Sequence, residues 1–189
     1  MTLVLDVSNN RTISAWSLKR SGAVGLIAKA TEGTSFVDTT YPQHRVVAHS
    51  VRVPFGGYLF LHSDSGGNEA EYFLTHARPV RGDIQPVVDA ERGLAKPEAD
   101  RALSCLRDLE EAGYAPILYG SASYLMAMLL TRPELHRYRI WEADYAPRRE
   151  PLQRHTSVVL WQFTDSYRVL LRRYDASRVF VPISTLTIP

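Results

Sequence analysis

The segment at residues 86–91 reads Pro86-Val87-Val88-Asp89-Ala90-Glu91 and lies near the middle of the 189-residue chain. The run that leads into it is short and suits a buried strand, and a proline is tolerated at the start of a strand. Asp89 and Glu91 follow at the carboxyl end, so their side chains point to the same face with Cα atoms about 6.5–7 Å apart. Neighbouring carboxylates raise each other's proton affinity, and they are costly to bury unless they are solvated, paired or used. We interpret the pair as a candidate acid–base site, while a solvated strand end remains the alternative.

Further apolar runs occur on both sides of this segment and alternate with helical patterns. The predicted strands are Leu3–Leu5, Val24–Ala30, Pro54–Leu61, Gln85–Val88, Ala115–Tyr119, Arg139–Tyr145, Val158–Phe163 and Arg173–Phe180. The predicted helices are Ser14–Lys19 (capped by Ser14 and ended by Gly22), Tyr41–Val51, Glu69–His76, Lys96–Ala112 and Ser121–Leu130. Strands that alternate with helices imply a parallel sheet with crossover helices.

We therefore expect a single-domain α/β fold: an irregular (β/α) TIM-like barrel of parallel strands, with some helices short or missing. The chain is shorter than the roughly 250 residues usual for such barrels, so an open doubly wound sheet is the competing arrangement. Neither glycine-rich nucleotide-binding motif is present in the sequence. Residues 147–154 are charged and contain prolines, which predicts a loop.

Composition narrows the functional classes. Hydrophobic residues make up 45% and charged residues 22%, as in ordinary globular proteins, and a net charge of +2 argues against nucleic acid binding. Cys105 is the only cysteine and lies in a helix-like apolar stripe, which favours a buried structural thiol. The first six residues lack a signal-peptide pattern, so we expect synthesis in the cytoplasm and no membrane insertion. Histidine and cysteine spacings match no metal signature, so no metal or cofactor is expected.

Polar and aromatic residues recur where the predicted strands end. In a barrel these ends converge on one mouth, at which we expect Asp6, Glu32, Asp89, Glu91, Tyr119, Asp144 and Gln162. Aromatic side chains are interleaved with them: Tyr58, Phe60, Tyr119, Trp141, Tyr145 and Trp161. Flat aromatic faces suit sugar rings, and a pair of carboxyl groups is what glycoside cleavage requires, although each aromatic residue alone could equally be core packing.

Taken together and in order, eight pieces of the chain resemble glycoside hydrolase family 25. These proteins are muramidases, or Chalaropsis-type lysozymes, and are often found as phage endolysins. The pieces are Leu5–Asn10, Ile27–Gly33, Gly56–Phe60, Pro86–Glu91, Ile117–Gly120, Trp141–Tyr145, Leu160–Phe163 and Asp175–Phe180. The match runs almost end to end, and its first, second and fourth pieces are distinctive in combination.

The resemblance implies a modified β/α barrel that hydrolyses the β-1,4 bond between N-acetylmuramic acid and N-acetylglucosamine. The expected partner is the glycan strand of bacterial peptidoglycan, reached after release from the cytoplasm. Residues 1–189 are expected to form the catalytic domain, without a separate cell-wall-binding domain. By position, Glu91 corresponds to the general acid, Asp89 to its partner, Asp6 to the groove floor and Asp175 to a late aspartate. The implied substrate-binding residues are Glu32, Tyr58, Phe60, Tyr119, Trp141, Asp144 and Gln162.

Two positions depart from the family pattern. Leu59 stands where histidine is usual, and Ser177 stands where asparagine is typical. The alternative function is a catalytically inactive peptidoglycan-binding or virion structural module on the same fold. A third possibility is an unrelated barrel hydrolase that acts on another amino-sugar polymer, such as chitin.

Overall fold

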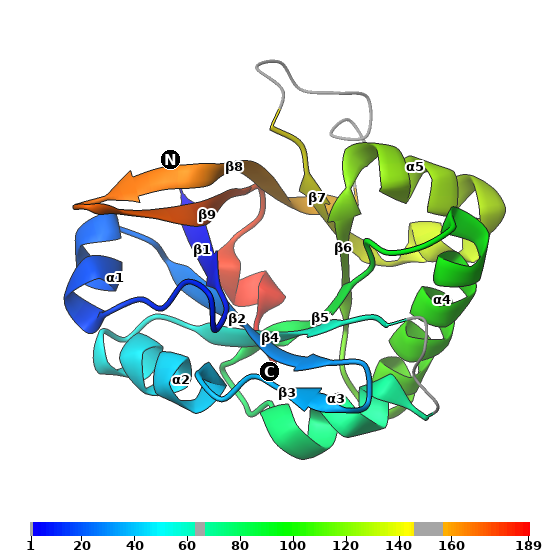
Figure 1. Cartoon of the computed structure of the whole chain (residues 1–189), viewed down its shortest axis with the longest axis horizontal. Coiled ribbons are helices and arrows are strands. Elements are labelled where there is room, and N and C mark those ends of the chain that lie inside the picture. The colour runs from blue at the N-terminus through cyan, green and yellow to red at the C-terminus, as the bar shows by residue number, and fades with distance from the viewer. Residues whose placement is uncertain (1, 63–66, 146–156) are drawn as a thin grey trace.

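The computed structural model describes residues 2–62, 67–145 and 157–189, and Figure 1 shows the helices arranged outside a ring of strands. The strands are β1 (Leu3–Val7), β2 (Gly25–Glu32), β3 (Phe36–Val37), β4 (Phe55–Phe60), β5 (Ile84–Asp89), β6 (Ile117–Ser121), β7 (Arg139–Ala143), β8 (Val158–Val169) and β9 (Arg172–Val179). The helices are α1 (Ala15–Ser21), α2 (Tyr41–Ser50), α3 (Glu69–Ala77), α4 (Ala95–Glu111) and α5 (Ala122–Thr131), with short 3₁₀ turns at Pro133–Arg137 and Ile183–Leu186.

Eight of the strands close into a barrel in the order β1-β9-β8-β7-β6-β5-β4-β2, and β1 pairs with β2 to complete it. Strand β3 adds a short antiparallel edge beside β2. The predicted fold class, an irregular β/α barrel in one domain, is therefore confirmed. Strand β3 was not predicted from the sequence, because two residues are too few to show a strand pattern.

Strand β9 departs from the expected parallel order. It runs antiparallel to both β8 and β1, whereas the remaining barrel strands pair in parallel. The reason is the connection: only Leu170 and Leu171 separate β8 from β9, and Leu170 has a φ of 57°. A parallel neighbour needs a crossover of a dozen or more residues, so this tight turn forces a hairpin.

Local signals explain where several elements begin and end. Helix α1 starts at the predicted cap, where the Ser14 side chain accepts a hydrogen bond from the Ser17 amide, and ends at Gly22 in the left-handed conformation. Strand β5 starts two residues before Pro86, and its ladder with β4 is irregular between the Gly56–Ile84 and Tyr58–Val87 pairs. A proline has no amide hydrogen to donate, which fits a break in the ladder there. The loop predicted at residues 147–154 lies outside the described residues.

The alternation of side chains along the strands divides the core into two parts. An inner cluster fills the barrel and includes Val4, Ile27, Val87, Ile117 and Trp141. An outer cluster packs between the barrel and the helices, and Cys105 of α4 is buried in it, as predicted. Because side chains repeat with a period of two, the inward-facing residues that follow the inner cluster reach the carboxyl end of the barrel.

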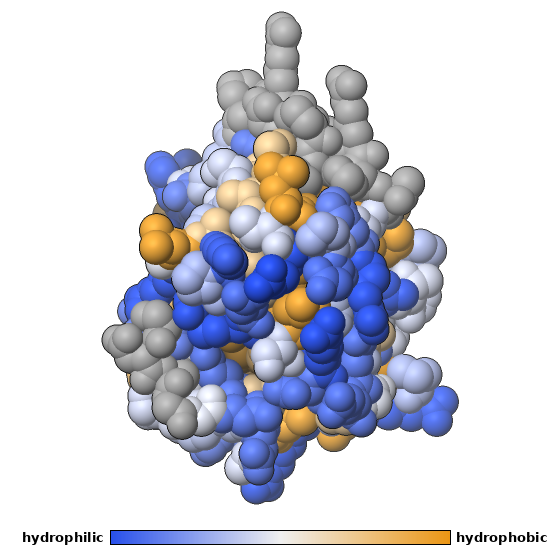
Figure 2. All heavy atoms as spheres, turned by 90° about the vertical axis from the view of Figure 1, so that its right-hand side faces the viewer, coloured by the Kyte–Doolittle hydropathy of each residue, from blue (hydrophilic) through white to orange (hydrophobic). Residues whose placement is uncertain are grey.

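The surface that carries α4 and α5 is mainly polar, and its apolar atoms form separate small spots (Figure 2). Leu94, Met126 and Leu130 are among the exposed apolar residues of these helices and their flanks. Within the described parts of the chain, no helix is both long and apolar enough to cross a lipid bilayer.

Candidate active site

A polar pocket of about 330 Å³ opens at the carboxyl end of the barrel strands. Four strands contribute the residue that lies two positions beyond Val4, Ile27, Val87 and Ile117 of the inner cluster. Side chains two residues apart on a strand point the same way, so these residues also face inward. Its lining residues are Asp6, Ser8, Asn9, Asn10, Arg11, Lys29, Tyr58, Phe60, Val87, Asp89, Glu91, Tyr119, Trp141, Tyr145, Gln162, Asp165 and Asp175.

Asp89 is the last residue of β5, and the backbone around it is fixed on both sides. The Leu61 amide donates to the Asp89 carbonyl at 2.9 Å, and the Ala90 amide donates to the Tyr119 carbonyl at 3.0 Å. These bonds hold the chain against β4 and β6 just before Glu91. The Asp89 side chain is buried, whereas Glu91 is exposed at the mouth.

The pKa values of both carboxyl groups, Asp89 and Glu91, are raised above their ordinary values. Burial raises the pKa of Asp89 well above its ordinary value, and the charge of Glu91 and a hydrogen bond between the two groups raise it further. Burial also raises the pKa of Glu91, which the hydrogen bond to Asp89 lowers. The resting proton is therefore favoured on Asp89.

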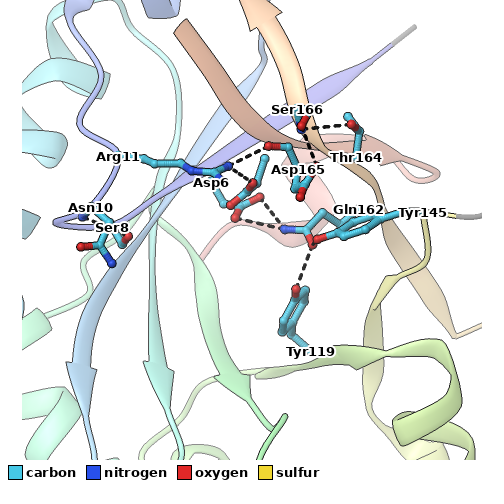
Figure 3. A network of polar contacts seen from close by, with 11 residues as sticks. Asp6, Ser8, Asn10, Arg11, Tyr119, Tyr145, Gln162, Thr164, Asp165 and Ser166 are labelled. Carbon is cyan, nitrogen blue, oxygen red and sulfur yellow. Dashed lines mark hydrogen bonds and ion pairs between the residues drawn. The ribbon is translucent and has the colours of Figure 1, made fainter.

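A hydrogen-bonded chain of side chains crosses the floor of the pocket (Figure 3). Gln162 donates from Nε2 to both carboxylate oxygens of Asp6, each at 3.1 Å. Its Oε1 accepts from the hydroxyls of Tyr119, at 2.9 Å, and Tyr145, at 2.8 Å. Gln162 is buried, and both its amide nitrogen and its amide oxygen have hydrogen-bond partners within this network. Its two bonds to Asp6 hold that carboxyl group in one orientation.

Asp6 lies directly opposite Asp175 in the β1–β9 ladder. Burial, followed by the charge of Asp175, raises the pKa of Asp6 well above its ordinary value, although Gln162 and Arg11 act in the opposite direction. Burial raises the pKa of Asp175 to about 6, against the opposing charge of Arg11. The floor of the pocket therefore carries a second carboxyl pair.

One wall of the pocket combines cations with an aromatic ring. Lys29 Nζ lies 2.5 Å from a carboxylate oxygen of Glu32 and 4.8 Å from the ring centre of Phe60. Arg92 contacts the other oxygen of Glu32 at 3.3 Å, and its guanidinium lies 4.8 Å from the same ring centre. Phe60 is thus held between two cations, both tied to Glu32.

Aromatic rings form another wall. Tyr119 and Trp141 meet edge to face, with ring centres 4.7 Å apart. Trp141 Nε1 donates to the Ser177 hydroxyl at 2.9 Å. Ser177, the residue that departs from the family pattern in the last motif, thus anchors an aromatic side chain of the pocket.

The structure brings most of the predicted site residues together. Asp6, Tyr58, Phe60, Asp89, Glu91, Tyr119, Trp141, Gln162 and Asp175 all line the pocket. Glu32 and Asp144 do not line it. Glu32 supports Lys29 from behind, and Asp144 contributes backbone bonds, with its amide donating to Gln162 and its carbonyl accepting from Trp161 Nε1.

Sequence reasoning missed Arg11, Lys29, Asp165 and the Ser8–Asn10 segment as pocket residues. Lys29 could have been found from alternation, because it lies two residues after Ile27. No sequence signal pointed to Arg11, whose contacts are more than 150 residues away along the chain. Leu59, the other departure from the family pattern, belongs to the outer cluster and faces away from the pocket.

Within the described residues, no group of three or more histidine, cysteine, aspartate or glutamate side chains is arranged to hold a metal ion.

The family comparison and the structural comparisons agree with each other. The sequence model described as glycosyl hydrolases family 25 matches residues 5–170. A family 25 glycosyl hydrolase from Bacillus anthracis has a TM-score of 0.82 at 21% identity, covering 96% of this chain and 90% of that one. A bacterial lysozyme from Streptomyces coelicolor scores 0.83 at 18% identity, covering 98% and 94%.

The CTP1L endolysin scores 0.79 at 24% identity, covering 95% of this chain and 66% of that one. At these identities the likeness to the solved structures is one of fold. A search of curated proteins returned no match.

Proposed function

The chain belongs to family 25 of the glycosyl hydrolases and is a glycoside hydrolase, and from this membership we propose that it is an N-acetylmuramidase. Its substrate is then bacterial peptidoglycan, and the bond cleaved is the β-1,4 linkage between N-acetylmuramic acid and N-acetylglucosamine. The observation that carries the proposal is the Asp89–Glu91 pair at the mouth of a polar, aromatic-walled pocket on this fold.

We infer the roles of the two carboxyls from the difference in their exposure. A general acid has to touch the glycosidic oxygen, and Glu91 is exposed at the mouth whereas Asp89 is buried. Glu91 is therefore the proposed proton donor. The hydrogen bond between the two groups gives the resting proton a path from Asp89 to Glu91. Once that proton has moved, Asp89 is ionised and stabilises the positive charge that develops on the sugar.

The remaining groups suit a sugar polymer. Tyr58, Phe60, Tyr119 and Trp141 offer apolar faces to the C–H surfaces of the rings, and the Asp6–Gln162 network offers hydrogen bonds to their rims. Lys29 brings a positive charge into the pocket that acts on Asp89, and its partner Glu32, which also binds Arg92, lies outside the lining. We propose that Asp144 contributes by orienting Trp161 and Gln162 through its backbone.

A cellular role follows as part of the same proposal. The endolysin among the fold neighbours, together with the sequence resemblance, supports a bacteriolytic enzyme that reaches the cell wall after release from the cytoplasm. The barrel described here is the proposed catalytic domain.

The test is a reducing-end assay on purified peptidoglycan, with mass spectrometry of the fragments. A muramidase yields fragments with muramic acid at the new reducing end, a glucosaminidase yields glucosamine ends, and an amidase releases peptides without new reducing ends. Glu91→Gln keeps the side-chain shape and removes the acid, so we expect cleavage to fall by at least about 10²-fold. Glu134→Gln, at an exposed glutamate on the Pro133–Arg137 turn, is the matched control and should cleave normally.

Three results would contradict the assignment. One is undiminished cleavage by a well-folded Glu91→Gln protein. Another is wild-type protein that binds peptidoglycan and releases no new ends, which would instead support an inactive binding module. The third is cleavage of chitin oligomers without cleavage of cell walls, which would indicate a hydrolase of another amino-sugar polymer.

A further inference from the structure

The pocket contains more acid than base. Five of its lining residues are carboxylic acids (Asp6, Asp89, Glu91, Asp165 and Asp175), and two are cations (Arg11 and Lys29). Lys29 is already paired with Glu32 outside the lining. The floor pair, Asp6 and Asp175, therefore depends on Arg11 for a compensating charge.

Arg11 contacts that pair through Asp175. It belongs to the loop after β1, and its Nη1 donates to Oδ1 of Asp175 at 2.5 Å and to the Asp165 carbonyl at 2.7 Å. Figure 3 shows the guanidinium directed toward Asp6 and Asp165. One end of Asp175 is thus taken by Arg11, while Asp6 beside it is held by Gln162.

We propose that Arg11 is a positioning residue, which through its ion pair with Asp175 decides which floor carboxyl is ionised and holds that anion against the pocket wall. This inference rests on the proposed function, since the anion it places is one that the substrate meets. Asp175 is then the fixed negative charge of the floor, and Asp6 is its protonated neighbour, donating to it.

The groups that face this pair agree with that assignment. Asp175 faces Asp6 on β1, Arg11 on the following loop and Asp165 on β8, and the hydrogen bond from Asp6 lowers the pKa of Asp175. Asp6 faces Gln162 on β8 and, at longer range, Glu91 and Asp89 at the end of β5. Tyr58, Tyr119 and Tyr145 border the same space with their pKa values raised by burial, so they stay neutral.

A purely structural role for Arg11 is the competing explanation. Its bond to the Asp165 carbonyl also ties the loop after β1 to the β8–β9 hairpin. Arg172 makes the same kind of tie without touching a carboxylate, because its Nη1 donates to the Thr12 carbonyl at 3.3 Å. Arg172 does not line the pocket, so Arg172→Gln is a matched control for loss of the tie alone.

The experiment compares wild type with Arg11→Gln, Arg11→Lys and Arg172→Gln, after thermal melts have confirmed that each is folded. Aspartate carboxyl carbons are titrated by NMR without substrate, and the pH profile of kcat/KM is measured on purified peptidoglycan. Burial raises the pKa of Asp175 to about 6 against the opposing charge of Arg11, so we expect the wild-type midpoint near that value. Arg11→Gln should raise the Asp175 midpoint by at least one pH unit and move the acid limb of the profile with it.

If the Asp175 midpoint rises by one unit, the ionised fraction of Asp175 at a pH below the midpoint falls by about tenfold. We therefore expect kcat/KM at pH 5 to fall by about tenfold. Arg11→Lys keeps the charge and should restore most of both readouts, while Arg172→Gln should change neither. The proposal is overturned if Arg11→Gln leaves the midpoint and profile unchanged, or if Arg172→Gln reproduces its effects. A wild type that fails to cleave peptidoglycan would defeat the proposed function, yet the NMR titration would still decide the role of Arg11.

Discussion

Replacement of Gly120 by alanine should disturb the catalytic pair without touching either carboxyl. Gly120 lies in β6 beside the chain that links Asp89 to Glu91. A Cβ placed on it would meet the Ala90 carbonyl oxygen at 2.8 Å and Cγ of Leu125 at 3.3 Å. A contact of 2.8 Å between a methyl carbon and a backbone oxygen is not tolerated, so one of the two strands has to move.

The size of the effect follows from that overlap. Relief of the contact needs a displacement of about half an ångström in a tightly packed interior. Because Ala90 joins the two acids, they move with it, and if a 1 Å misplacement costs about 10²-fold in rate, half of that costs about tenfold. Overpacking of this kind also costs about 1–3 kcal/mol of stability, or about 2–12 °C in Tm for a chain of this size.

Peptidoglycan cleavage and thermal melting measure the two effects on one sample. Gly67→Ala is the matched control, because its added Cβ would meet Thr34 at 3.6 Å, an ordinary contact, and no positive φ is involved. We expect Gly120→Ala to lose about tenfold in kcat/KM at a pH and temperature where it is fully folded. A Gly120→Ala protein with the kcat/KM and Tm of the wild type would refute the argument that close strand packing places the acids.

Two further outcomes are expected. Asp89→Asn should be inactive yet melt at a higher temperature than wild type at pH 7. Burial raises the native pKa of Asp89 above the unfolded value near 3.8, so the wild-type carboxyl contributes stability below that value and loses this contribution as the pH rises. The gain in Tm of Asp89→Asn should therefore shrink toward pH 4, and a gain that grew on acidification would contradict this reasoning. Tyr119→Phe and Tyr145→Phe should each lower the free energy of unfolding in urea by about 1 kcal/mol or less, because Gln162 Oε1 keeps the other hydroxyl as a donor. The double variant leaves this buried acceptor unpaired and should cost about 1–3 kcal/mol more than the sum of the two single variants. Strictly additive effects would count against a shared acceptor.

Sequence reasoning located the pocket because strand ends and side-chain alternation are local properties. Asp6, Asp89 and Tyr119 follow inner-cluster residues by two positions, so their direction could be read from the sequence alone. The same rule accounts for the absence of Asp144 from the pocket lining. Trp141 and Ala143 face inward, so Tyr145 is the next inward residue, and Tyr145 lines the pocket.

Glu32 illustrates what alternation cannot reveal. The β2–β4 register shifts between Lys29 and Thr31, so a count of residues along β2 fails beyond that point. Lys29 enters the pocket, and Glu32, which lies level with Phe60, binds Lys29 and Arg92 instead. An irregularity of this kind depends on tertiary packing, and the sequence of residues 25–32 does not predict it.

The direction of β9 was the feature with the greatest consequence for the floor of the pocket. Asp175 is in the first half of β9, and in a strand parallel to β8 that half would lie at the closed end of the barrel, far from Asp6. The hairpin reverses the strand, so that Asp175 is paired with Asp6 and comes within reach of Arg11. The two-residue turn at Leu170 and Leu171 therefore does more than close the barrel, because by reversing β9 it places Asp175 among the carboxylates of the pocket floor.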